Sequence, residues 1–143
     1  MKNQHTATLA GYEIPRLGMG TMALAIEGRP TNRNQAIETI HAALDAGVRY
    51  LDTAWSYYLP SKPGTGEPED MGYGEYLVRD ALNSWHGPKD EVLVATKTGW
   101  LRTLDNHGNY SWQADARPET MIANAKESAR RLGVETLDLM YSH

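Results

Sequence analysis

Cysteine and phenylalanine are absent from this chain of 143 residues. The lack of cysteine excludes disulfides and thiol chemistry, and it favours a reducing compartment. Basic residues are also scarce, since 14 lysines and arginines stand against 18 aspartates and glutamates, and they form no basic block. With a net charge of −4, the chain is not expected to bind nucleic acid. The five histidines lack the spacing of metal ligands, so we expect no metal site.

Long apolar segments are missing as well. Residues 1–6 are polar and no apolar region follows them, so they do not form a secretory signal. The apolar run from Met22 to Ile26 is far too short to cross a membrane. We therefore expect a soluble cytoplasmic protein with no membrane partner, and the chain length suits one domain at most.

What the sequence does contain is an alternation of strand-like and helical segments. Residues 8–15 alternate around Gly11 and predict a small hairpin. Short apolar runs predict strands at 16–21, 48–52, 91–96 and 137–141. Apolar residues spaced by three and four predict helices at 31–46, 73–85 and 118–132. We interpret the polar or proline- and glycine-rich segments between them as long loops, at 59–72 and 99–116.

Each predicted helix has one apolar face and recognisable ends. In the third helix, Pro118 occupies a first-turn position and Gly133 follows the last residue. We expect this helix to bury an apolar stripe formed by Met121, Ile122, Ala125, Ala129 and Leu132.

Two folds compete for such a pattern. Residues 18–23 match the fingerprint G-x-G-x-x-A of doubly wound dinucleotide-binding folds. That motif must open a helix at once, whereas residues 24–30 intervene before a helix start at Thr31. The alternative is a parallel (β/α)8 barrel of the TIM type, an α/β fold that takes about 250 residues. We therefore interpret residues 1–143 as the truncated N-terminal half of one barrel domain, in which a hairpin precedes the first four strands and three helices.

Polar residues follow three successive predicted strands. Asp52 ends the second strand, Tyr57 lies five positions later, and Lys97 and His143 close the next two strands. The strand ends of a barrel converge on one pocket, where catalytic groups concentrate. Each residue alone has an ordinary structural interpretation, but their joint placement favours a catalytic site.

The chemistry that suits these four side chains is reduction of a carbonyl group. Hydride reaches the carbonyl carbon and the oxygen takes a proton, for which Tyr57 is a usable acid. A nearby ammonium stabilises a phenolate, which assigns Lys97 to tuning Tyr57 and Asp52 to holding Lys97. An imidazole orients the carbonyl oxygen, which assigns His143 to that role. By chemistry alone, Tyr58 could replace Tyr57.

The same segments resemble the aldo-keto reductases from Leu9 to His143, nearly the whole chain, but over only the first half of the family's length. The resemblance rests on the segments 17–22, 47–54, 74–82, 94–97 and 131–139. It identifies Asp52, Tyr57, Lys97 and His143 with the catalytic residues of the family. The family's spacing between the acid and the phenol selects Tyr57 over Tyr58.

The resemblance also implies a cofactor. The family binds NADP(H), or in some members NAD(H), without a Rossmann motif. Gly20, Thr21, Met22 and Asp52 would then lie near the nicotinamide ribose. Barrel enzymes commonly hold phosphate in the loops after strands seven and eight, which are not among the strands of this chain.

Aromatic residues near the predicted site suggest where a substrate would enter. We interpret Trp55, Tyr58 and Trp100, together with His143, as the lining of the substrate mouth. Ordinary packing of the loops is the alternative interpretation. Because the loop at 59–72 is longer than is usual in the family, no substrate specificity is inferred from the resemblance.

Three hypotheses for function follow. The first is NAD(P)H-dependent reduction of a small-molecule aldehyde or ketone by the full-length protein, which the complete set of four residues favours. The second is a non-catalytic barrel relative that binds cofactor and acts as a regulatory or interaction subunit. The third is a half-barrel that pairs with another chain. For the fragment alone, we expect self-association and no activity.

Overall fold

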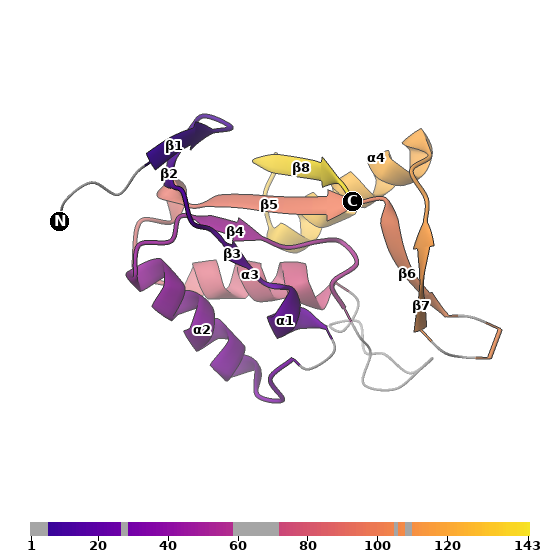
Figure 1. The fold of residues 1–143 in the computed structure, drawn as a ribbon, viewed down its shortest axis with the longest axis horizontal. Coiled ribbons are helices and arrows are strands. Elements are labelled where there is room, and N and C mark those ends of the chain that lie inside the picture. Colours follow the sequence, from indigo (N-terminus) through magenta and orange to yellow (C-terminus); the bar gives the residue numbers. More distant parts are fainter. Residues whose placement is uncertain (1–5, 27–28, 59–71, 105, 108–109) are drawn as a thin grey trace.

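The fold is built on a sheet of four parallel strands. A computed structural model describes residues 6–26, 29–58, 72–104, 106–107 and 110–143. The sheet contains β3 (Met19–Gly20), β4 (Tyr50–Asp52), β5 (Leu93–Thr98) and β8 (Leu139–Ser142), which neighbour one another in chain order (Figure 1). Each neighbouring pair is parallel.

This strand order distinguishes between the two competing folds. A doubly wound fold places later strands on both sides of its first strand, whereas a barrel adds each new strand on the same side. Here β3 stands at one edge and the later strands follow it in sequence. The order excludes the doubly wound fold and confirms the barrel arrangement.

The three predicted helices connect these strands. They are α2 (Arg33–Asp45), α3 (Tyr73–Ser84) and α4 (Pro118–Leu132), and α3 packs against both of the others. The core between helices and sheet contains fully buried side chains from three elements, namely Ile40, Leu44, Leu51 and Leu77. Burying a side chain of this size stabilises the fold by about 1.5–3 kcal/mol.

The predicted N-terminal hairpin is present. It pairs β1 (Thr6–Leu9) with β2 (Tyr12–Pro15) in antiparallel register, and its turn places Ala10 and Gly11 in the left-handed region, at φ +49° and +86°. The Tyr12 hydroxyl donates to Asp138, just before β8, at 2.9 Å. Ile14 packs with Leu93 and Ala95 of β5. The hairpin therefore covers the amino-terminal ends of the sheet strands.

Two short helices were not predicted. One turn of helix, α1 (Met22–Ala25), begins directly after β3, in the segment expected to be irregular. One reason for setting aside the doubly wound fold was therefore wrong, and the strand order decides the matter instead. A 3-10 turn, η1 (Lys89–Glu91), delays the third sheet strand, so that Lys97 lies inside β5 rather than after it.

The segment 99–116, predicted as a polar loop, contains a second hairpin. It pairs β6 (Trp100–Leu104) with β7 (Tyr110–Ala114) in antiparallel register. The prediction was wrong because polar residues mask an alternation of strand-forming residues, including tryptophan, tyrosine and threonine. Across the hairpin, the hydroxyls of Thr103 and Ser111 lie 3.2 Å apart.

The predicted apolar stripe of α4 is correct only in part, because Leu132 is buried as expected but other members are not. Ile122 is 56% exposed, whereas the buried residues of this helix are Asn124, Ser128, Arg131 and Leu132. The reason is that the facing elements are themselves polar: Asn124 donates to Thr98 of β5 at 2.8 Å, and Arg131 pairs with Glu75 of α3. Hydropathy alone could not identify this face.

Two further expectations concern other segments. The long loop predicted at 59–72 lies, except for Gly72, outside the described residues. Within the described ranges, every helix is too short or too polar to cross a membrane.

Candidate active site

Asp52 and Lys97 form an ion pair at the carboxyl ends of β4 and β5. The Lys97 Nζ donates to Asp52 Oδ2 at 2.6 Å and to the carbonyl of Thr53 at 2.8 Å. The strand register explains the pairing. Asp52 lies opposite Ala95, and alternation along β5 puts Lys97 on the same face as Ala95. The two side chains are 28% and 12% exposed, so water screens the pair only partly.

Tyr57 lies in the loop after β4, beside this ion pair. The Lys97 Nζ is 4.8 Å from the centre of the Tyr57 ring. Backbone bonds fix the loop, because Trp55 N–H donates to Lys97 O at 3.0 Å and Gly74 N–H donates to Tyr57 O at 2.8 Å. The ring is buried, with 5% of Tyr57 exposed. The conformation of the loop therefore places the Tyr57 ring next to the Lys97 ammonium.

His143 completes the group from the end of β8. Its backbone N–H donates to Thr98 O at 2.7 Å, which extends the pairing of β8 with β5. The imidazole meets the Tyr57 ring edge-on, with ring centres 6.0 Å apart and planes at 82°. In the described part of the chain, its buried Nδ1 has no hydrogen-bond partner.

The charge state of His143 follows from its surroundings. Burial lowers the pKa of His143, the Lys97 ammonium lowers it further, and the Asp52 carboxylate partly opposes both. The neutral imidazole is therefore favoured at neutral pH. A neutral imidazole carries one N–H, which can donate to a carbonyl oxygen without placing a second full positive charge beside Lys97.

A pocket of about 340 Å³ opens beside Tyr57 and His143. Its other lining residues are Met22 of α1, Trp100 of β6 and Trp112 of β7. These three side chains are largely apolar and each is about half exposed. A second hollow, of about 310 Å³, is lined mainly by α3, η1, β5 and the segment that follows α4, and it contains none of the four predicted catalytic residues. The pocket over Tyr57 is therefore the candidate substrate site.

Sequence reasoning missed one wall of this pocket. The sequence places Trp112 in a polar loop, whereas in the structure it lies on β7 opposite Arg102 and lines the pocket together with Trp100. The alternation of Tyr110, Trp112 and Ala114 was the signal that could have identified the strand. The Arg102 guanidinium lies 4.5 Å from the centre of the Trp112 ring.

Trp55 and Tyr58, also expected at the substrate mouth, are not among the five residues that line the pocket. Tyr58 is 2% exposed, and its hydroxyl donates to Arg102 O at 2.7 Å, which ties β6 to the loop after β4. Trp55 packs edge-on against Tyr58, with ring centres 6.0 Å apart. Both side chains pack within the loops here, and their contact with substrate stays a prediction.

Three of the four residues predicted near the cofactor, Gly20, Thr21 and Met22, lie where β3 ends, and Asp52 lies at the end of β4. Gly20 is exposed, and nothing lies within 4 Å of the position that a Cβ would take. Met22 faces the pocket. Thr21 is fully buried, and both its N–H and its hydroxyl donate to Asp52 O, at 2.9 and 3.0 Å. Thr21 therefore joins β3 to β4, and the open surface is that of Gly20 and Met22.

Comparison with known proteins identifies the class to which this chain belongs. The model of the aldo/keto reductase family matches residues 16–143, and the chain belongs to that family. It is 32% identical to D-threo-aldose 1-dehydrogenase from a Pseudomonas species, over 96% of this chain and 42% of that protein. It is 28% identical to pyridoxine 4-dehydrogenase from Escherichia coli, over 96% of this chain and 43% of the relative. The chain thus spans about two fifths of the length of these relatives.

Solved structures agree on the fold. Glycerol dehydrogenase AKR11B4 from Gluconobacter oxydans superimposes with a TM-score of 0.72 at 28% identity, over 97% of this chain and 39% of that one. Aldo-keto reductase AKR11C1 from Bacillus halodurans superimposes with a TM-score of 0.68 at 26% identity, over 96% of this chain and 39% of that one. The four-stranded sheet is therefore part of a TIM-type barrel.

Proposed function

We propose that the full-length protein catalyses NAD(P)H-dependent reduction of small aldehydes or ketones. The observation that carries the proposal is the grouping of Asp52, Lys97, Tyr57 and His143. Two of the four, Tyr57 and His143, line one apolar pocket. Relatives with the same family fold are named as dehydrogenases and reductases, which supports oxidation and reduction at an alcohol or carbonyl carbon.

Under this proposal, the Tyr57 hydroxyl gives its proton to the carbonyl oxygen. The Lys97 ammonium, 4.8 Å from the ring centre, stabilises the negative charge that the phenol acquires. Asp52 holds that ammonium in place through the 2.6 Å contact. His143, neutral and edge-on to the phenol, donates to the same carbonyl oxygen and fixes its direction.

The described residues fit a nicotinamide ring at the end of β3. Gly20 leaves open space, Met22 supplies an apolar surface beside the pocket, and Asp52 lies at the paired position on β4. A bound NAD(P)H supplies the hydride that the carbonyl carbon accepts. The Met22 side chain and the two tryptophans of the β6–β7 hairpin would keep water from the reacting carbon. The phosphates of the cofactor would bind in loops beyond this chain, as is common in barrels.

Turnover by the full-length protein tests the proposal. The protein is mixed with NADPH and a simple aldehyde, and loss of the reduced-nicotinamide absorbance is followed. Steady consumption that requires the aldehyde supports a carbonyl reductase. Saturable NADPH binding with no turnover of a broad aldehyde and ketone panel would instead favour the non-catalytic, cofactor-binding relative.

A further inference from the structure

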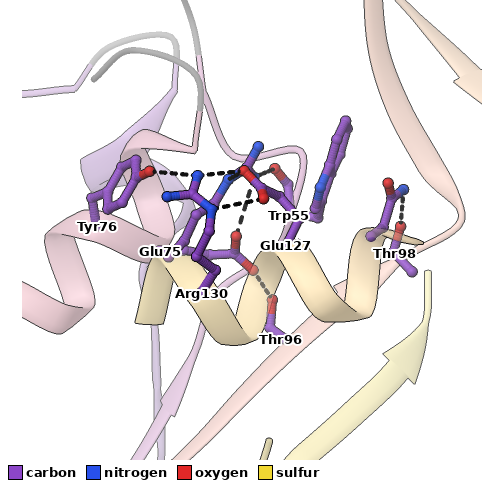
Figure 2. Close-up of polar contacts among 9 residues, drawn as sticks. Trp55, Glu75, Tyr76, Thr96, Thr98, Glu127 and Arg130 are labelled. Carbon is purple, nitrogen blue, oxygen red and sulfur yellow. Dashed lines mark hydrogen bonds and ion pairs between the residues drawn. The ribbon is translucent and has the colours of Figure 1, made fainter. Parts of the chain in front are cut away.

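A buried ion pair lies behind the loop that carries Tyr57. Glu75, in the first turn of α3 and labelled in Figure 2, pairs with Arg131, in the last turn of α4. Glu75 Oε2 and Arg131 Nη1 are 3.2 Å apart. Their side chains are 0% and 5% exposed. Charged groups are almost never buried this deeply unless they are paired, so the pairing constrains both helices.

The remaining hydrogen bonds of the pair reach the sheet and the loop. Thr96 of β5 donates to Glu75 Oε1 at 2.6 Å (Figure 2). Arg131 donates through Nη1 to the carbonyl of Trp55 at 3.1 Å, and through Nε to Glu127 at 3.2 Å. The Arg131 guanidinium also lies 5.0 Å from the centre of the Trp55 ring. The pair therefore joins α3, α4 and β5 to the loop after β4.

Two hydrogen bonds fix the backbone around Tyr57, one at the carbonyl of Trp55 and one at the carbonyl of Tyr57 itself. Arg131 fixes the carbonyl of Trp55, two positions before Tyr57. Gly74, the residue before Glu75, donates its N–H to Tyr57 O at 2.8 Å. A Cβ on Gly74 would lie 2.8 Å from Tyr57 Cβ and 2.9 Å from Tyr57 O, so the start of α3 sits directly against the tyrosine backbone.

The Glu75–Arg131 pair is better suited to fixing the geometry of its neighbours than to stabilising the fold. A buried ion pair often contributes no more stability than apolar side chains of the same volume, because desolvation offsets the attraction. Its hydrogen bonds, however, have fixed directions, and an arginine presents a planar fork of donors that a lysine lacks. A group that must hold a loop in one conformation benefits from those directions.

We propose that Glu75 and Arg131 are positioning residues that fix the Tyr57 phenol against Lys97 and His143; this inference rests on the proposed reductase function. The pair acts at a distance from the reacting atoms, through the backbone of Trp55 and the first turn of α3. Misplacement of a catalytic group by about 1 Å can cost about 10²-fold in rate.

The test uses the full-length protein and the double variant Glu75→Gln/Arg131→Met, which leaves no buried charge unpaired. The matched control is Arg130→Met, because Arg130 is the neighbouring arginine, is 62% exposed, and bonds Glu127 and the Tyr76 hydroxyl rather than the loop (Figure 2). We expect kcat for aldehyde reduction to fall about 10²-fold in the double variant, with KM changed much less. Arg130→Met should keep wild-type kcat.

Two further measurements separate positioning from general stability. In a Tyr57→Phe background, adding the double substitution should cause no further loss, because the residue being positioned no longer donates a proton. A further loss as large as in the wild-type background would overturn the proposal. If the double variant does not fold, the single variant Arg131→Lys is measured instead. A lysine cannot contact Glu75, Glu127 and the carbonyl of Trp55 at the same time, so kcat should lie below wild type but by less than about 10²-fold.

Amide hydrogen exchange tests the inference independently of activity. Exchange at residues 54–58 should be at least tenfold faster in the double variant than in Arg130→Met, with the remaining core unchanged. Equal exchange in this segment would contradict the positioning role even if the enzyme is active. Faster exchange in a protein without reductase activity would support the positioning role and count against the proposed function alone.

Discussion

The ammonium of Lys97 lies between a carboxylate and a phenol ring, 2.6 Å from Asp52 Oδ2 and 4.8 Å from the centre of the Tyr57 ring. This arrangement fixes the position of the ammonium relative to the phenol ring. Asp52 fixes where the positive charge stands, and that charge then faces the ring that would become negative on giving up a proton.

Replacing Lys97 by methionine removes the charge and keeps much of the side-chain volume. In the full-length protein we expect kcat to fall at least about 10²-fold, because negative charge on the phenol is no longer stabilised. Lys89→Met is the matched control, since Lys89 lies on exposed 3-10 backbone and donates to Asn83 O at 2.9 Å. Steady-state kinetics decides the matter, and equal losses at the two lysines would remove Lys97 from the mechanism.

The pKa of His143 provides a prediction that needs no substrate. Because burial and the Lys97 ammonium lower this pKa, the ring should titrate below the ordinary value of about 6.5. Because the folded state then binds this proton more weakly than the unfolded state, the free energy of unfolding decreases as the pH falls. The decrease begins near the unfolded-state pKa of about 6.5 and is complete below the lowered pKa of the folded state.

NMR titration of the imidazole measures the effect directly. Lys97→Met should raise the midpoint of His143 from its wild-type position, because one of the two lowering causes is gone. A wild-type midpoint at or above the ordinary histidine value would contradict the proposed neutral imidazole.

The tryptophan wall of the pocket is expected to affect binding more than chemistry. Trp112→Ala should raise KM for an aldehyde about tenfold, because it removes an aromatic surface from the pocket, whereas Trp112→Phe should raise it much less. The kcat values should stay within a few-fold of wild type. A large fall in kcat with unchanged KM would show that this hairpin takes part in the chemical step instead.

The 143-residue chain by itself is expected to associate and to be inactive. Within the described residues, β3 and β8 each have one strand neighbour in the main sheet, and unpaired strand edges promote association. Light scattering of the purified chain, combined with NADPH titration, measures both properties. A monodisperse monomer that binds NADPH tightly would contradict the expectation that further barrel strands are needed for the cofactor.

Much of the fold was predictable because it depends on local patterns. The three long helices follow from apolar spacing and from end signals such as Gly133, which takes the left-handed φ of +73°. The parallel strands follow from apolar runs between helices. The barrel order was inferred for partly wrong reasons, since a helix does begin at Met22, directly after β3.

What the sequence could not reveal is tertiary in origin. The buried face of α4 is polar because Arg131 meets Glu75, and no periodicity of apolar residues signals an ion pair between helices. The β6–β7 hairpin was missed because Trp112 and its neighbours stand among polar residues. The meeting of Asp52, Lys97, Tyr57 and His143 was predictable because the strand ends of a barrel converge and because the segments that carry these residues resemble the aldo-keto reductases.

The identity of the proton donor is the central claim, and one pair of variants tests it most directly. Tyr57→Phe and Tyr58→Phe each remove one hydroxyl, from two residues that are consecutive in the sequence. The Tyr57 side chain lines the pocket, whereas the Tyr58 hydroxyl donates to Arg102 O at 2.7 Å. The measurement is the rate of aldehyde reduction in a single turnover by the full-length protein. We predict a loss of about 10²–10⁴-fold for Tyr57→Phe and a much smaller loss for Tyr58→Phe. Equal losses, or a larger loss at Tyr58, would contradict the assignment.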